Sequence, residues 1–90
     1  MTPEIFTQCK LEYDHQMVKY ISSHHPSLTA YLSDTNYQSR QEYDEANGCD
    51  YIEFFCVMEG HKYTQLFCVT DGRVEILTDI IDTLNQDEVE

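Results

Sequence analysis

The sequence predicts an α+β fold: an N-terminal helix packed on a three- to four-stranded antiparallel β-meander, followed by a short C-terminal helix. Three observations support this. Apolar residues recur at helical spacing near the start of the 90-residue chain, β-rich segments alternate with short turns in its second half, and the apolar faces of the two regions match. The length corresponds to one small acidic domain, residues 1–90, with 85–90 expected to be a frayed acidic tail.

A helix is expected over residues 3–22. Thr2-Pro3-Glu4 supplies an N-cap hydroxyl, a proline at the first helical position and an acid in the first turn. The helix should end before Pro26, because proline disfavours helical backbone in the residue that precedes it. Its apolar stripe consists of Phe6, Cys9, Tyr13, Met17 and Tyr20, spaced three or four residues apart.

The middle of the chain supports more than one interpretation. Apolar and polar residues alternate over 27–34, which favours a short strand, although a one-turn helix after Pro26 fits nearly as well. In residues 34–46, Ser39-Arg40-Gln41-Glu42 resembles a helix capping box, whereas Asn47-Gly48 is a strong hairpin signal, and we favour the hairpin. If Asn47-Gly48 closes a two-residue turn, Glu42 lies opposite Glu53, a destabilising pair of like charges.

The second half predicts strands over 51–58, 61–70 and 73–77, joined at Glu59-Gly60 and Asp71-Gly72. Two-residue turns fix the register, and the helix should pack on the more apolar face. That face contains Ile52, Phe54, Cys56, Met58, Tyr63, Phe67, Val69, Val74 and Ile76. The other face contains Tyr51, Glu53, Phe55, Val57, Lys62, Thr64, Leu66, Cys68, Glu75 and Leu77.

A short last helix is expected after the third strand. Thr78 or Asp79 can cap it, with Ile80, Ile81 and Leu84 facing inward and Asp82 facing outward.

The charge restricts the possible partners. Seventeen acids against five Lys or Arg give a formal charge of −12, which would repel nucleic acid and anionic membranes. No apolar run approaches the roughly 18 residues that a membrane span needs. The N-terminus lacks the basic and apolar regions of a secretory signal, so we expect a cytoplasmic protein with free thiols.

The sequence offers no convincing catalytic, cofactor or metal site, and we expect a protein that is not an enzyme. The spacings of Cys9, Cys49, Cys56 and Cys68 match no zinc motif, and Cys49, after the Asn47-Gly48 turn, is expected to be the most exposed of the four. His24 and His25 lie at the predicted C-terminal end of the helix, where a positive charge interacts favourably with the helix dipole. Adjacent side chains on a helix point about 100° apart, so the two rings cannot easily share one metal ion. His15 and His61 are isolated in sequence, with no ligand set beside them.

What remains is an excess of charge. A charge of −12 exceeds the magnitude of about 2–8 that keeps a small domain soluble. Seven tyrosines add a residue type that is common at protein interfaces. We therefore expect binding to a basic nucleic-acid-binding protein or complex, and a homodimer also fits the half-apolar second face. The expected partner-binding residues are Glu42, Asp44, Glu45, Asp50, Glu53, Glu75, Asp79, Asp82, Tyr43 and Tyr51, with the tail acids Asp87, Glu88 and Glu90 close to the last group.

In size, charge and composition the whole chain resembles the small acidic anti-defence inhibitors encoded by phages, the DNA-mimicking antirestriction and anti-CRISPR proteins. The resemblance implies action in the host cell cytoplasm, with surface carboxylates that stand in for phosphates in a basic nucleic-acid channel. Two alternatives use the same sequence features. One is an immunity protein that neutralises a basic nuclease toxin, and the other is a non-catalytic adaptor subunit that binds through the apolar part of the second sheet face.

Overall fold

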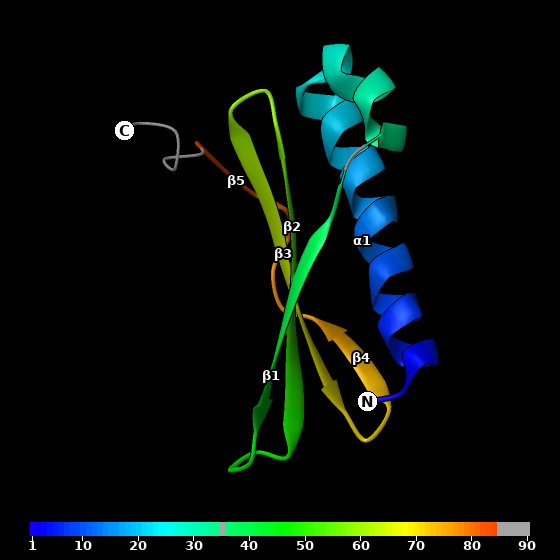
Figure 1. The fold of residues 1–90 in the computed structure, drawn as a ribbon, viewed down its shortest axis with the longest axis vertical. Coiled ribbons are helices and arrows are strands. Elements are labelled where there is room, and N and C mark those ends of the chain that lie inside the picture. Colours follow the sequence, from blue (N-terminus) through cyan, green and yellow to red (C-terminus); the bar gives the residue numbers. More distant parts are fainter. Residues whose placement is uncertain (35, 85–90) are drawn as a thin grey trace.

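The computed structural model describes residues 1–34 and 36–84 of the chain. Its elements are α1 (Pro3–His24), the 3₁₀ helix η1 (Pro26–Asp34), β1 (Gln38–Asp44), β2 (Cys49–Met58), β3 (His61–Thr70), β4 (Arg73–Ile76) and β5 (Ile81–Leu84). The strands form one antiparallel sheet in the order β1-β2-β3-β4, and β5 pairs with β3 next to β4. Helix α1 runs along one side of this sheet (Figure 1), which confirms the α+β class.

Helix α1 forms as the sequence predicts and extends two residues further. The hydroxyl of Thr2 accepts a 3.2 Å hydrogen bond from the backbone N–H of Ile5, and Pro3 occupies the first turn. The helix ends at His24, because His25 precedes Pro26 and leaves the helical conformation. The side chains that α1 buries against the sheet are Cys9, Tyr13, Met17 and Ile21.

Residues 26–34 form the nine-residue 3₁₀ helix η1, so the expected strand is wrong, and the alternative of a one-turn helix is right in kind but too short. The backbone N–H of Leu28 bonds to the carbonyl of His25 at 2.8 Å, which turns the chain tightly after Pro26. Leu28 thereby reaches the core, where it is buried beside the end of α1. A strand at residues 26–34 would have led the chain away from the C-terminal end of α1 instead of folding it over that end.

The hairpin of β1 and β2 forms, but with a different turn. Asp44 pairs with Cys49, so the loop has four residues, 45–48, in place of the predicted two. The Asp44 carboxylate explains the difference, because it accepts hydrogen bonds from the backbone N–H groups of Ala46 and Asn47 and from the Asn47 side chain. Gly48 ends the loop with a φ of +65°.

The longer loop moves the register of β1 by two residues. Glu42 consequently lies opposite Tyr51, and Arg40 lies opposite Glu53. The predicted Glu42–Glu53 repulsion is therefore wrong. Because the shift is even, each side chain of β1 keeps the face that the sequence predicted for it.

The meander of β2, β3 and β4 confirms the predicted register. Met58 pairs with His61 and Thr70 pairs with Arg73 across two-residue turns. Both residues of each turn have positive φ, as Glu59 at 52° and Asp71 at 54° show together with the glycines that follow them. The face with Phe54, Cys56 and Phe67 is buried under α1, as predicted, while Ile76 at the margin of this face is 42% exposed.

The predicted C-terminal helix is wrong, because residues 81–84 form β5. Strand β4 pairs only with Phe67–Thr70, so the same edge of β3 is still open at His61–Thr64, and β5 pairs there. Extended backbone satisfies those N–H and C=O groups of β3, whereas a helix would leave them to water. Thr78 bridges the gap between the strands, since its carbonyl accepts from the buried Gln65 side chain and its hydroxyl accepts from Leu66 N–H.

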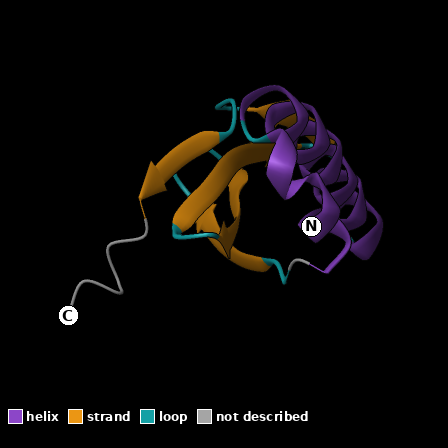
Figure 2. Ribbon diagram, turned by 90° about the horizontal axis from the view of Figure 1, so that it is seen from above, coloured by secondary structure: helices purple, strands orange, loops and turns teal. Residues whose placement is uncertain are grey.

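Among residues 1–34 and 36–84, helices cover one side of the sheet and leave the other side uncovered (Figure 2). Viewed from above, both helices lie on the same side of the strands (Figure 2). We call the other side the open face. Its strand residues are Gln38, Arg40, Glu42, Asp44, Cys49, Tyr51, Glu53, Phe55, Val57, Lys62, Thr64, Leu66, Cys68, Thr70, Arg73, Glu75, Ile81 and Thr83.

Candidate functional site

Two neighbouring hollows lie at the β1–β2 hairpin. The first, of about 330 Å³, lies on the open face, and the second, of about 620 Å³, adjoins the loop end of β1. They share Glu42 and Tyr51. Together they are the hairpin site, which is lined by Arg40, Gln41, Glu42, Tyr43, Asp44, Glu45, Tyr51, Ile52, Glu53 and Leu66.

The register explains why these side chains meet. Glu42 on β1, Tyr51 on β2, Cys68 on β3 and Glu75 on β4 form one row across the four strands. The next row contains Arg40, Glu53 and Leu66. Directly opposed side chains on one face of a sheet lie about 4.5–5.5 Å apart at Cβ, so the hairpin site is a contiguous patch.

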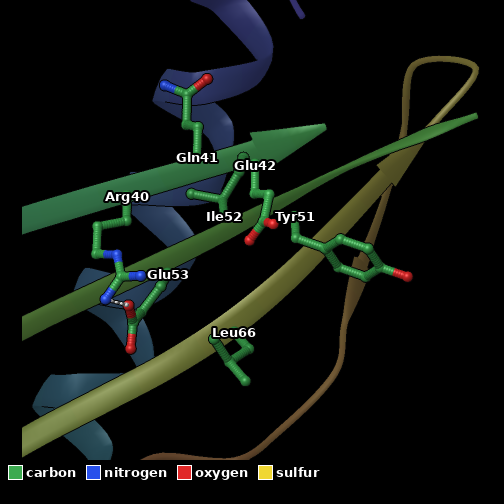
Figure 3. Close-up of a pocket in the computed structure, with 7 residues that line it drawn as sticks. All are labelled: Arg40, Gln41, Glu42, Tyr51, Ile52, Glu53 and Leu66. Carbon is green, nitrogen blue, oxygen red and sulfur yellow. Dashed lines mark ion pairs between the residues drawn. The ribbon is translucent and has the colours of Figure 1, made fainter. Parts of the chain in front are cut away.

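The first hollow combines carboxylates with apolar and aromatic surface. Figure 3 shows Glu42, Glu53, Tyr51 and Leu66 on the same side of the strands, with Gln41 pointing to the opposite side of β1. Nη1 of Arg40 lies 3.7 Å from Oε1 of Glu53. The Arg40 side chain is 78% exposed and that of Glu53 26% exposed, so the guanidinium rests on the rim of the hollow.

The second hollow is lined by three carboxylates and two tyrosines, with no basic side chain among its lining residues. The Asp44 carboxylate is held in place by the loop, and the hydrogen bond from the Asn47 side chain holds its pKa below the ordinary value. Hydrogen bonding to Cys49 raises the pKa of Tyr51 to about 12, so this ring carries a neutral hydroxyl at physiological pH. Tyr43 is 59% exposed.

Four of the predicted partner-binding residues lie away from the open face. Tyr43 and Asp50 are paired with each other in the sheet and face the helix side, where Asp50 Oδ2 lies 3.8 Å from the N-terminal ammonium. Asp79 and Asp82 lie on the helix side near the end of α1. Glu75 is on the open face but lies three strands from Glu42, in a separate depression with Arg73. Asp87, Glu88 and Glu90 are outside the described residues.

Asp82 belongs to a cluster that the sequence did not predict. Its carboxylate accepts hydrogen bonds from the Tyr20 hydroxyl at 2.8 Å, from His61 Nδ1 at 2.7 Å and from His25 Nε2 at 3.1 Å. The expectation that Asp82 faces outward is therefore wrong, and His61, which is isolated in sequence, joins this cluster through the fold. The pairing of β5 with β3 places Asp82 opposite Tyr63 on the helix side of the sheet, and no local signal in the sequence indicates this pairing.

The environment of Asp82 favours its ionised form. Partial burial acts to raise the pKa of this carboxyl, but the hydrogen bonds from His61, Tyr20 and His25 outweigh it and hold the pKa below the ordinary value. Nδ1 of His61 and Nε2 of His25 face the Asp82 carboxylate, and the Tyr20 hydroxyl bonds to it from α1. The cluster therefore ties β5 to α1 and to the start of β3. Among residues 1–34 and 36–84, no group of three or more His, Cys, Asp or Glu could hold a metal ion.

Cys9, Cys56 and Cys68 lie in settings that favour the neutral thiol. Burial raises the pKa of Cys9 and of Cys56. A hydrogen bond with Thr70 acts to lower the pKa of Cys68, but partial burial and the neighbouring Cys49 outweigh it and raise the pKa. Cys49 is buried, at 5% exposure, so the expectation that it is the most exposed cysteine is wrong. It opens β2 and packs beside Tyr51 rather than extending the turn.

Neither family models nor curated proteins nor solved structures gave a match to this chain. Within the part of the chain that the structure describes, no helix has both the length and the apolar character needed to cross a membrane.

Proposed function

We propose that this chain is an acidic, non-catalytic inhibitor that occupies the basic nucleic-acid-binding surface of a host defence protein or nuclease. The observation that supports this most directly is the hairpin site, whose two adjoining hollows hold four carboxylates and two tyrosines against one basic side chain, Arg40. In this proposal the protein acts in the cytoplasm of the host cell as a DNA mimic, in the manner of anti-CRISPR proteins.

The arrangement of the carboxylates suits a partner that binds a phosphate backbone. Glu42 and Asp44 are two residues apart on β1 and share the open face, which separates them by about 7 Å along the strand. Glu45 continues the series into the loop. Strand and loop geometry thus spreads negative charge along a line, which a groove lined with Lys and Arg can follow.

Tyrosine and charge have different roles in such a contact. The net charge of −12 would accelerate the encounter with a basic partner, because electrostatic steering raises association rates at low ionic strength. Tyr43 and Tyr51 offer rigid apolar area with a polar end, which is the kind of surface that binding energy concentrates on. The predicted partner is therefore basic and presents a groove rather than a flat patch.

The proposal is tested by competition. Proteins captured on the immobilised chain at low and at high salt would be purified, and their binding to nucleic acid measured with and without this chain. We expect a captured nucleic-acid-binding protein to lose its nucleic acid as this chain is added. A captured partner that keeps its nucleic acid contradicts the proposal. A nuclease toxin as partner would assign the chain to the immunity class, which uses the same surface.

One observation favours a second candidate function. The open face exposes apolar side chains away from the hairpin site, with Val57 at 42% and Ile81 at 40% exposure. A non-catalytic adaptor subunit could bind through this area without using the carboxylates. Its affinity would not change with salt, and it would fall on Val57→Ser but not on neutralisation of Glu42 and Glu45.

A further inference from the structure

We infer that the first hollow of the hairpin site receives an arginine side chain of the basic partner, which displaces the chain's own Arg40 from Glu53. This inference rests on the proposed function, because it names the side chain through which the partner engages the site. It concerns the open-face surface bounded by Glu42, Tyr51, Glu53 and Leu66 (Figure 3).

The hollow is short of one cation. It contains two carboxylates, Glu42 and Glu53, and one guanidinium, that of Arg40. Arg40 lies within ion-pair distance of Glu53, and among the described residues no Lys, Arg or His pairs with Glu42. An incoming cation would therefore find one carboxylate unpaired and the other held by a rim contact.

Arg40 is held weakly. The 3.7 Å separation from Glu53 is longer than the roughly 2.7–2.9 Å of a charge-assisted hydrogen bond. Its side chain is 78% exposed, and exposed pairs of this kind contribute little to stability. The contact nevertheless shows that a guanidinium reaches the Glu53 carboxylate from the solvent side, which is the position that a partner's arginine would take.

The rest of the hollow favours arginine over lysine. The Tyr51 ring and the Leu66 side chain supply aromatic and aliphatic surface next to the carboxylates. A planar guanidinium can stack on such a ring while its fork of N–H groups bonds to a carboxylate in bidentate geometry, whereas a lysine ammonium is a point charge without that planar fork. The same face already holds a cation against a ring, since Nζ of Lys62 lies 4.4 Å from the centre of the Phe55 ring.

Two peptides of equal charge test the inference directly. Acetylated tetra-arginine and tetra-lysine would be titrated into the ¹⁵N-labelled protein, and dissociation constants taken from amide shifts. We expect the arginine peptide to bind more tightly, with the largest shifts in β1 and β2. Glu53→Gln should weaken its binding by up to about fivefold, the equivalent of the roughly 1 kcal/mol of a good exposed ion pair. Glu75→Gln, which removes the same charge from the same face, should have less effect.

Two arginine variants separate displacement from general charge. Arg40→Gln and Arg73→Gln remove one positive charge each from the open face, so long-range attraction of a cation increases equally in both. If Arg40 occupies the position beside Glu53 that the partner's arginine takes, its removal should tighten binding of the arginine peptide clearly more than removal of Arg73. Circular dichroism of each variant would establish that the sheet is intact.

Equal binding of the two peptides, equal effects of Glu53→Gln and Glu75→Gln, or no binding of tetra-arginine would each overturn the inference. None of these results contradicts the proposed function, because charge alone can bring a basic partner to the hairpin site. The proposed function fails instead when the captured partner keeps its nucleic acid, whichever peptide binds.

Discussion

Nδ1 of His61 lies 2.7 Å from Oδ1 of Asp82, a contact that joins the first residue of β3 to the short strand β5. Because an ionised carboxylate only accepts hydrogen bonds, the ring nitrogen that faces it carries the proton. Asp82 also accepts from Tyr20 and His25, so one side chain that is 16% exposed connects β5 with α1, with the residue that follows α1 and with the sheet. The attachment of β5 should therefore depend on this carboxylate.

Asp82→Asn is expected to lower the free energy of unfolding by about 1–3 kcal/mol at neutral pH, because it replaces charge-assisted hydrogen bonds with weaker ones. The pKa of Asp82 is lowered in the folded state, so this stabilisation is complete above the unfolded pKa of about 3.9 and is lost as pH falls through the folded pKa. Urea unfolding of both proteins between pH 7 and pH 2 should show their difference shrinking in acid. A difference that stays constant over that range contradicts this role.

Tyr13→Phe tests the attachment of α1 to the sheet. The hydroxyl of Tyr13 is buried and donates a 2.8 Å hydrogen bond to the Tyr63 carbonyl. Its removal should cost about 1–3 kcal/mol of unfolding free energy, since it leaves a buried acceptor with one partner fewer. Tyr43→Phe removes the same atom from an exposed side chain and should change stability by less than about 0.5 kcal/mol. Equal effects of the two substitutions would mean that the buried bond contributes nothing.

The four-residue loop of the hairpin predicts the outcome of a glycine substitution. Gly48 has a φ of +65°, and a Cβ added there would meet no atom within 4 Å, so Gly48→Ala should cost about 1–2 kcal/mol through backbone conformation alone. Gly48→Asn should cost less, because asparagine tolerates this conformation. Thermal unfolding would rank the two variants. A Gly48→Ala variant as stable as the parent protein would show that the loop adopts another conformation.

The net charge predicts a dependence of stability on salt. Seventeen acids against five bases repel one another in the folded state, and screening shortens the Debye length to about 8 Å at physiological ionic strength. The melting temperature should therefore rise between low and moderate NaCl. Differential scanning calorimetry in both conditions checks this, and an unchanged or lower melting temperature counts against repulsion as a significant cost.

The parts of the fold that the sequence predicts well depend on local signals. Thr2-Pro3 and Pro26 mark the ends of α1, and Asp71-Gly72 closes a two-residue turn that sets the register of β3 and β4. Strict alternation in β2 then separates the buried face from the open face. In each case neighbouring residues determine the backbone, so no knowledge of distant contacts is needed.

The errors at β5 and at Asp82 occur where distant parts of the chain decide the structure, whereas the error at the hairpin loop comes from local hydrogen bonds to Asp44. Residues 81–84 have a pattern that a short helix could use, and only the unpaired edge of β3 makes them a strand. The Asp44 carboxylate outcompetes the Asn47-Gly48 signal because it bonds to the loop backbone, and this replaces the predicted Glu42–Glu53 pair with Arg40–Glu53. Distant contacts also assemble the cluster at Asp82, since its members come from α1 and its C-cap, from β3 and from β5.

The residues of the candidate site could likewise be predicted only in part. The acids Glu42, Asp44, Glu45 and Glu53 and the ring of Tyr51 could be predicted from their density in the sequence, because the hairpin brings them together. Asp50 and Tyr43 could not be placed correctly from density alone, since alternation along a strand directs them to the helix side. Asp79 and Asp82 depend on β5, whose pairing the sequence does not reveal.

Association kinetics can establish whether the carboxylates of the hairpin site compete with nucleic acid for a basic partner. The variant Glu42→Gln/Glu45→Gln/Glu53→Gln would be compared with a control, Glu4→Gln/Glu59→Gln/Asp71→Asn, which removes the same charge from exposed positions outside the site. Surface plasmon resonance against the captured partner over a salt series should show slower association for the hairpin variant than for the control, with loss of competition against nucleic acid.

If one carboxylate meets a buried arginine, dissociation should also accelerate, at a cost of about 2–5 kcal/mol in binding free energy. Equal kinetics for the two variants, with an affinity that does not change with salt, would contradict the account and favour the apolar adaptor surface.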